Sequence, residues 1–460
     1  MKKLLLNTSK TNQQNLFYSP LSDMLDMNDP LIALANAIDW NIFENEFMGF
    51  YSKDGKPAKP IRLMVGLLLL KQLKNLSDEE IVLQWKQNPY FQYFCGFNEF
   101  QVCEPCHSTQ LVKFRQRIGK KGMELIFKVS VQLHGDASEE KQVLIDTTVQ
   151  EKNITYPTDG KLAIKMIHHL HKIAKENSIA LRRTFVKEIK EHRINLRFFK
   201  HPKKIKKAKA SIKRLRTIVG ILIRDISRIL PQEQLVNYQD KFDLFEKVRN
   251  QQIKDSNKVL SLHETHVYAI TKGKDHKKYE YGTKASIVAT KDSGVIVGVV
   301  SHSKNEHDSK TLEAALTSAN KTRITPIKEA ICDRGYRGIK EVLGTTICIP
   351  ATPLKRDTEY QKQKKREKFK RRATIEPIIG HLKSDFRLAR NYLKGFIGDQ
   401  INLLLAATAW NLKKWMNLYF FALIFGEIKL LIKSISQIKL YYQIFLQLLI
   451  IKLITIPGKI

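Results

Sequence analysis

The fold class that the sequence predicts is α/β: a mixed sheet flanked by helices, with a helical N-terminal domain and a basic helical insert. Short apolar runs rich in β-branched residues occur at 142–150 and again between 266 and 352. Helical periodicity dominates residues 30–135 and the stretch 160–255 between the two strand regions. With that stretch set aside, the order strand, hairpin, helix, strand, helix is one from which a helix-covered mixed sheet is assembled.

The composition points to a polyanionic partner. Lys and Arg outnumber Asp and Glu by 79 to 45, which gives a formal charge of +34. Within the insert, nine of the seventeen residues from 200 to 216 are Lys or Arg. Such clusters favour a phosphate polymer, although solvated helix faces would explain the same pattern. The candidate DNA contacts in this cluster are Lys203, Lys204, Lys206 and Lys207.

The part of the chain before the first strand divides into an arm and a helical domain. Residues 1–29 are expected to form an N-terminal arm, for which disorder is one option. Residues 30–135 carry apolar side chains at helical spacing, and Ser77 precedes three acids as a helix cap. Basic residues lie among the apolar positions of a later helix, so we expect a DNA-binding domain with a basic face that includes Lys113, Arg115 and Arg117.

The sheet is expected to be built by residues 140–159 and 256–416. After the first strand, "HVYAITKG", "YGTKASIVAT" and "VIVGVVSHS" have the composition of strands, and "KDSG" predicts a hairpin between the last two. A helix is expected to be capped near Asp308, a strand to end at Asp333, and "TTICIPAT" to form a further strand. A helix from Pro377 onward closes the domain.

Three acidic residues are candidates for a common site. Asp146 lies inside an apolar strand, where a carboxylate is unfavourable unless it is paired or bound to a cation. Asp333 follows the end of another strand, where open sheets place ligands. Glu376 comes directly after a strongly basic run. Salt bridging of Asp146 and a turn role for Asp333 are the alternatives, but together the three could hold hard divalent cations against a phosphodiester.

Basic residues around Glu376 are candidates for phosphate contacts. On a continuous helix Arg372, Glu376 and Lys383 would share one face. Pro377 disfavours helical geometry in the residue before it, so a helix that starts at Pro377 with Glu376 as its cap is the alternative. In that case the place of Arg372 is less defined.

Further residues have two readings each. Arg334 and Arg337 could contact phosphate, or belong only to a glycine turn. Asp308 is a rival metal ligand, but a helix cap is preferred. His263 and His266 lack the spacing of a zinc helix and are expected at a strand edge.

Three segments resemble the acidic-motif blocks of bacterial insertion-sequence DDE transposases, the insertion-sequence-five group in particular. They are "LIDTTVQEKNITYPTDGKL", "ICDRGYRG" and "RRATIEPIIGHLK". The resemblance implies an RNase H-like catalytic domain in which Asp146, Asp333 and Glu376 are the catalytic, metal-binding triad. In a Tyr-Arg-Glu-Lys signature of a related group, Arg372, Glu376 and Lys383 fit the last three places, and Phe369 stands at the tyrosine place.

The function implied by this resemblance is that of a DNA transposase. It would bind the terminal inverted repeats of its insertion sequence, cleave phosphodiester bonds with two Mg²⁺ ions, or Mn²⁺ in their place, and join the 3′-OH ends to target DNA. The partners would be double-stranded DNA and a second copy of the chain at the two ends. The alternatives are a metal-dependent nuclease that does not join, and an inactive DNA-binding remnant.

The compartment and the C-terminal tail are also expectations. Five cysteines and an N-terminus with only three consecutive leucines indicate a reducing compartment, so we expect a cytoplasmic protein without a membrane partner. Residues 417–460 are apolar but broken by charges. A packed helix pair is the first reading of this tail, and a membrane-surface segment or a foreign extension are the others.

Overall fold

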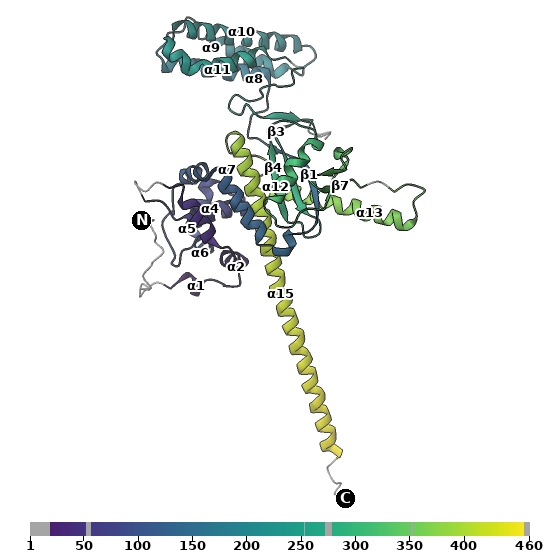
Figure 1. The fold of residues 1–460 in the computed structure, drawn as a ribbon. Coiled ribbons are helices and arrows are strands. Elements are labelled where there is room, and N and C mark those ends of the chain that lie inside the picture. Colours follow the sequence, from purple (N-terminus) through teal and green to yellow (C-terminus); the bar gives the residue numbers. More distant parts are fainter. Residues whose placement is uncertain (1–18, 52–56, 253, 272–277, 351–352, 455–460) are drawn as a thin grey trace.

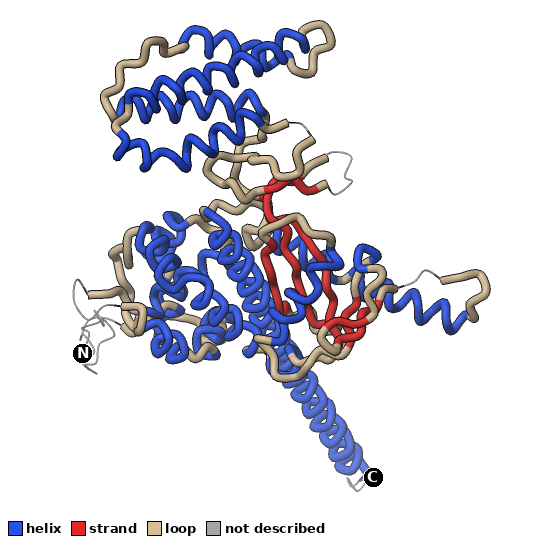
Figure 2. The backbone as a smooth tube through the Cα atoms, turned by 45° about the horizontal axis from the view of Figure 1, so that its top comes forward, coloured by secondary structure: helices blue, strands red, loops and turns tan. Residues whose placement is uncertain are grey.

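The structure is a computed structural model with three bodies and one long helix (Figures 1 and 2). A helical N-terminal domain lies beside a domain that contains the sheet, and the insert lies beyond one end of this sheet. The C-terminal helix runs between the first two bodies and continues away from them. The described residues are 19–51, 57–252, 254–271, 278–350 and 353–454, with the side chains of 368, 369 and 427–454 excepted.

The N-terminal domain is a cluster of helices around one apolar core. Ser77 accepts a hydrogen bond from Glu80 N while the Glu80 side chain accepts one from Ser77 N, so the predicted cap is confirmed as a capping box. The helices are α1 (Leu21–Met24), α2 (Pro30–Ala37), α3 (Trp40–Met48), α4 (Ile61–Leu73), α5 (Asp78–Gln87), α6 (Pro89–Phe94) and α7 (Ser108–Gln132).

The predicted basic face of this domain is wrong at Arg115. Its guanidinium is buried and donates two hydrogen bonds to Asp78, which also pairs with Lys71 at 2.9 Å. Burial alone would raise the pKa of Asp78, but the two cations outweigh burial and lower this pKa to about 2. Of the three predicted cations, Lys113 and Arg117 are exposed, and only these two are placed to face DNA.

The sheet has seven strands and both parallel and antiparallel pairs, so the predicted mixed sheet is confirmed. Its order is β2-β3-β1-β5-β7-β6, and β4 pairs with β3 on the same edge as β2. Pairing is antiparallel from β4 through β3 to β1, and parallel from β1 through β5 to β7. The strands are β1 (Gln142–Glu151), β2 (Tyr268–Ile270), β3 (Glu280–Thr290), β4 (Ile296–His302), β5 (Glu329–Ile331), β6 (Glu341–Val342) and β7 (Thr345–Cys348).

Helices cover the sheet and carry part of the site. Leu144 of β1, Ile331 of β5 and Ile375 of α14 form a small buried cluster that holds α14 against the centre of the sheet. The helix α12 packs against β4. The elements of this domain are η1 (Gly135–Ser138), η3 (Asp308–Thr311), α12 (Leu312–Asn320), η4 (Arg334–Tyr336), α13 (Glu359–Ala373) and α14 (Ile375–Ser384).

The insert is a four-helix unit with its own core. Leu170, Leu215 and Phe245 belong to an apolar cluster that is separate from the main core. Its hydrophobic faces therefore pack on one another and not on the sheet. Its elements are α8 (Asp159–Glu176), α9 (Val186–Asn195), η2 (Leu196–Phe198), α10 (Ile205–Ile229) and α11 (Gln232–Asn250).

The helix α15 (Gly395–Ile454) connects the N-terminal domain to the sheet. It contacts α2, α4 and α7 as well as β4. Its buried Asn411 donates to Ile296 O at 2.8 Å and accepts from Ile296 N at 2.9 Å, and it also reaches Ser130 of α7. One side chain thus joins a strand and a helix of two different domains.

The C-terminal tail continues α15 as one helix up to Ile454, so the predicted helix pair is wrong. Leu418, Phe420 and Phe421 are among its exposed apolar side chains. Across the described residues, no helix combines the length and the apolar character needed to cross a membrane.

A buried charged cluster joins the end of β1, the segment before β2 and the start of α15. Lys152 Nζ lies 2.5 Å from Asp399 Oδ1 and 3.4 Å from Glu264 Oε2, and it donates to Gly395 O. His266 Nε2 lies 2.8 Å from Asp399 Oδ2. Asp399 and Glu264 are only 1% and 2% exposed. His266 therefore stands just before β2 as a partner of a buried carboxylate.

Candidate active site

Asp146 occupies the middle of β1, the strand at the centre of the sheet. It is directly opposite Ile287 of β3, and its Oδ1 accepts a hydrogen bond from Thr147 N at 2.7 Å. Its Oδ2 lies 3.3 Å from Arg372 Nη2. The strand thus holds a mostly buried carboxylate whose partner comes from a distant helix.

Glu376 lies in the first turn of α14, and Arg372 lies in the last turn of α13. Pro377 has no N–H to donate to the carbonyl of Ala373, which explains why α13 ends there. Thr374 keeps helical geometry and is the cap residue, so the alternative of Glu376 as the cap is wrong. The shared face survives, since Arg372 Nη1 lies 3.1 Å from Glu376 Oε1.

One guanidinium therefore bridges two of the three predicted acids. Arg372 pairs with Asp146 on the sheet and with Glu376 on the helix. Its Nε is buried and has no hydrogen-bond partner among the described residues. The site therefore already holds a positive charge between two carboxylates, with one buried donor left unsatisfied.

Asp333 follows β5 and reaches the same region from the neighbouring strand. Its Oδ1 accepts from Gly335 N at 2.8 Å, so the turn role is real. A methyl group on Gly335 would lie 3.0 Å from Asp333 Oδ1 and 3.1 Å from Asp308 Oδ2. Burial raises the pKa of the Cys332 thiol, and the charges of Asp333 and Asp146 raise it further. Both predicted acids are thus close enough to this thiol to act on its pKa.

Asp308 is not the predicted helix cap, because His307 takes that place and accepts from Ser309 N. The Asp308 carboxylate instead accepts from Thr147 Oγ1 at 3.0 Å and pairs with Lys284 Nζ at 2.9 Å. Sequence reasoning missed Lys284 and Thr147. A lysine inside the apolar strand "YGTKASIVAT" was the available signal, since a buried ammonium needs a carboxylate partner.

The other predicted DNA contacts are spread over the surface. Arg334 and Arg337 are exposed beside Asp333, and Lys383 is half-buried in the last turn of α14. The four lysines of the insert are exposed at the start of α10, in a different body from the acids (Figure 1); they are Lys203, Lys204, Lys206 and Lys207. The side chain of Phe369 lies outside the described residues.

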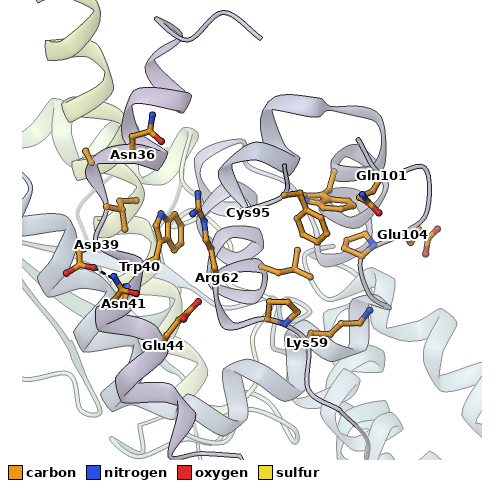
Figure 3. A pocket seen from close by; sticks show the side chains of 18 of the residues that line it. Asn36, Asp39, Trp40, Asn41, Glu44, Lys59, Arg62, Cys95, Gln101 and Glu104 are labelled. Carbon is orange, nitrogen blue, oxygen red and sulfur yellow. Dashed lines mark hydrogen bonds between the residues drawn. The ribbon is translucent and has the colours of Figure 1, made fainter. Parts of the chain in front are cut away.

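A separate cavity of about 680 Å³ lies in the N-terminal domain (Figure 3). The guanidinium of Arg62 lies 4.8 Å from the ring centre of Trp40 and donates to the carbonyls of Tyr93 and Phe94. Both side chains are thus engaged within the protein. The carboxylates of Asp39, Glu44 and Glu104 and the cations of Lys59 and Arg62 all line this cavity, so it has no strong preference for one sign of charge.

Comparisons with known proteins match both main domains. A family described as a transposase domain (DUF772) matches residues 19–117, and a family described as a transposase DDE domain matches residues 257–412. A protein of Rhizobium meliloti, described as uncharacterized protein ORF8 in nfe locus, is 39% identical over 196 residues, which cover 42% of this chain and 95% of that protein. No solved structure matches the chain.

The mixed sheet, its acids and these matches define a DNA-processing enzyme with an RNase H-like domain. The chain belongs to the insertion-sequence DDE transposases, which act on DNA and depend on a divalent metal, typically Mg²⁺. The predicted family, fold class and enzyme class are thus confirmed. Membership of the insertion-sequence-five group stays a prediction.

The donor set fits a hard divalent cation. All three predicted ligands supply carboxylate oxygens, which Mg²⁺ and Mn²⁺ prefer. Two of them already approach one cationic group, Arg372. Among the described residues, however, no three His, Cys, Asp or Glu side chains are arranged as a ready metal site. In this structure the guanidinium of Arg372 lies between the carboxylates of Asp146 and Glu376.

Replacing Arg372 with methionine is expected to strengthen Mn²⁺ binding by the DNA-free protein about tenfold. The change removes a positive charge next to two carboxylates, and such a charge is worth about 1–2 kcal/mol in a partly solvated site. Titration calorimetry without DNA measures the effect. Arg371→Met is the matched control, because Arg371 is exposed and its nearest carboxylate is that of Asp292 at 3.5 Å. Equal affinities of the two variants would contradict the expectation.

Proposed function

We propose that this transposase binds the terminal inverted repeats of its insertion sequence, cleaves there and joins the freed 3′-OH ends to target DNA, with Asp146, Asp333 and Glu376 as the catalytic residues. The observation that supports this most is the convergence of the acids. Asp146 and Glu376, far apart in the chain, share the guanidinium of Arg372, and Asp333 follows β5, the strand next to β1.

The three carboxylates would hold two Mg²⁺ ions, with Mn²⁺ as a substitute. When bound, such ions neutralise the phosphodiester and activate a water or a 3′-hydroxyl. Arg372 and Lys383 lie on or near α14 and would hold phosphate oxygens beside the acids. Arg334 and Arg337, exposed next to Asp333, would hold the adjoining backbone.

We assign DNA recognition to the helical domain 30–135 and DNA backbone contacts to the insert 160–255. Catalysis belongs to 140–159 and 256–416. A homodimer at the paired ends follows from the need to hold two ends at once. A cytoplasmic location fits a protein whose substrate is bacterial DNA.

An in vitro reaction with short duplexes that carry the element's ends tests the proposal. Products joined to a target plasmid are expected in the presence of Mg²⁺. Cut but unjoined ends would indicate a nuclease, and binding without cutting would indicate an inactive remnant. Either of these outcomes would overturn the proposed function.

Replacing Lys203, Lys204, Lys206 and Lys207 together with alanine is expected to weaken DNA binding without changing sequence preference. Each lost phosphate contact lowers the slope of log affinity against log salt by about 0.9 in magnitude. Binding to an end duplex and to a scrambled duplex, measured at several salt concentrations, should weaken equally. A loss confined to the end duplex, or a loss independent of salt, would assign another role to this cluster.

A further inference from the structure

The insert carries a basic hollow at its neck, close to where the chain enters it from β1. This neck hollow has a volume of about 520 Å³. Its apolar floor includes Ile164 of α8 and Leu196 of η2. Four cations line it, two from α8 and two from the segment of α9 and η2: Lys161, Lys165, Arg193 and Arg197.

The floor of the neck hollow is closely packed. A methyl group on Gly160 would lie 2.6 Å from Leu196 Cδ1. The first turn of α8 thus packs directly against η2, and cations from both elements line the same hollow. The hollow is a formed feature of the insert and not a gap between loops.

Among the residues that the structure describes, no carboxylate lines the neck hollow. Two acids close in sequence pair elsewhere: Asp159 binds Arg216 at 2.9 Å, and Glu188 binds Arg214, while Glu191 of α9 is exposed and is not among the residues that line the hollow. Within the described part of the chain, none of the four lining cations has a carboxylate within ion-pair distance, and Lys165 Nζ donates to the neutral Thr155 Oγ1. The hollow therefore carries uncompensated positive charge, which a polyanion would neutralise.

Aromatic rings stand beside these cations. Tyr156 is 61% exposed, and Lys161 Nζ lies 6.0 Å from its ring centre. The Tyr156 ring meets the Tyr281 ring edge-on at 5.5 Å, and Tyr279, also exposed, lies next to Tyr281. Exposed rings next to unpaired cations form the pattern by which proteins bind single-stranded nucleic acid, since every unpaired base offers a face for stacking.

We propose that the neck hollow and Tyr156 form a binding site for single-stranded DNA. The four cations hold consecutive phosphates, and one unpaired base stacks on Tyr156. A duplex does not fit this site equally well, because its bases have no free face. The inference rests on the proposed function in that DNA is the partner. It assigns to the insert the binding of the single strand that is present when the base pairs at an element end are open.

The charge of the site is tested with the full-length protein, a fluorescent twelve-nucleotide single strand and no metal. Lys161→Ala with Lys165→Ala is expected to weaken binding about tenfold and to lower the salt slope by about 1.4, for two lost contacts on a single strand. The control is Lys172→Ala with Lys175→Ala, on the far half of the same helix, which should change the affinity less than twofold. Equal losses in the two variants would overturn the proposal.

The stacking contact is tested at Tyr156. Tyr156→Ala is expected to weaken binding of the single strand about tenfold. Tyr156→Phe should keep the affinity, and binding of a duplex of the same sequence should not change in either variant. An equal loss on the duplex, or no loss on the single strand, refutes a site for unpaired DNA. Thermal melting of the exposed-site variants checks that they remain folded.

These measurements are independent of cleavage. They are repeated in an Asp146→Asn background, where the catalytic proposal predicts no cutting. If Tyr156→Ala did not weaken single-strand binding in this background, the single-strand site would be refuted, and the proposed function would be unaffected. Absence of cutting and joining by the unaltered protein would argue against the proposed function while leaving the single-strand site standing.

Discussion

Replacing Asp146 with asparagine is expected to reduce strand cleavage at least about a thousandfold, because the amide keeps the size of the side chain but removes a charged oxygen ligand worth several kcal/mol. Asp333→Asn and Glu376→Gln should have the same effect for the same reason. Binding to the end duplex should change less than threefold. Gel assays of nicking and joining on labelled ends measure the first effect, and mobility shifts measure the second.

The control for these variants is Asp292→Asn in the β3–β4 hairpin. This carboxylate is exposed, and its ion pair within the described residues is with the exposed Arg371 at 3.5 Å, so cleavage should be unchanged. If one of the three acid variants kept cleavage near the unaltered rate, that residue would lose its catalytic assignment. If all three lost DNA binding as well, a structural role would explain them better.

Replacing Asp399 with alanine is expected to lower the free energy of unfolding by about 3–5 kcal/mol, the range found when one partner of a buried ion pair is removed. Lys152 would keep a buried charge with its nearest carboxylate gone, and His266 would lose the nearer of its two carboxylate partners. Urea unfolding followed by tryptophan fluorescence measures the loss. Limited proteolysis should show cleavage first in the linkers to the insert.

Asp385→Ala is the matched control, since Asp385 pairs with His381 at 2.8 Å on the surface. Exposed pairs contribute about 0–1 kcal/mol, so its effect should be small. Lys152→Met combined with Asp399→Leu should recover part of the lost stability, because it removes the buried ion pair of these two residues while Glu264 keeps His266 and Gly395 N as partners. Equal effects of Asp399→Ala and Asp385→Ala would mean that water reaches the cluster.

The mixed sheet was predictable because strand patterns are local. A run such as "VIVGVVSHS" predicts a strand wherever it pairs, and the hairpin signal in "KDSG" fixes its neighbour. The positions of Asp146 and Asp333 in their strands followed from the same patterns. What brings these acids together is the strand order, and the chain shows that order only through its likeness to a known family.

The errors arose where a distant partner decides the role of a residue. Arg115 belongs to a basic helix in the sequence, but in the structure its side chain is buried in an ion pair with Asp78. Lys152 and Asp399 form an ion pair although they are 247 residues apart in the chain, and the sequence around either residue does not predict the other. The local rule at Pro377 offered a helix start at this proline, whereas α13 and α14 meet at Thr374 and the ion pair between Arg372 and Glu376 spans that junction.

The position of α15 has a consequence for the length of DNA between recognition and reaction. Because Asn411 fastens this helix to β4 and to α7 together, the helical domain and the sheet cannot slide past one another without breaking buried hydrogen bonds. On the proposed assignment of DNA recognition to the helical domain and of cleavage to the sheet domain, the protein sets the number of base pairs between the recognised sequence and the scissile bond. Every element end that this enzyme processes should be cut at the same offset.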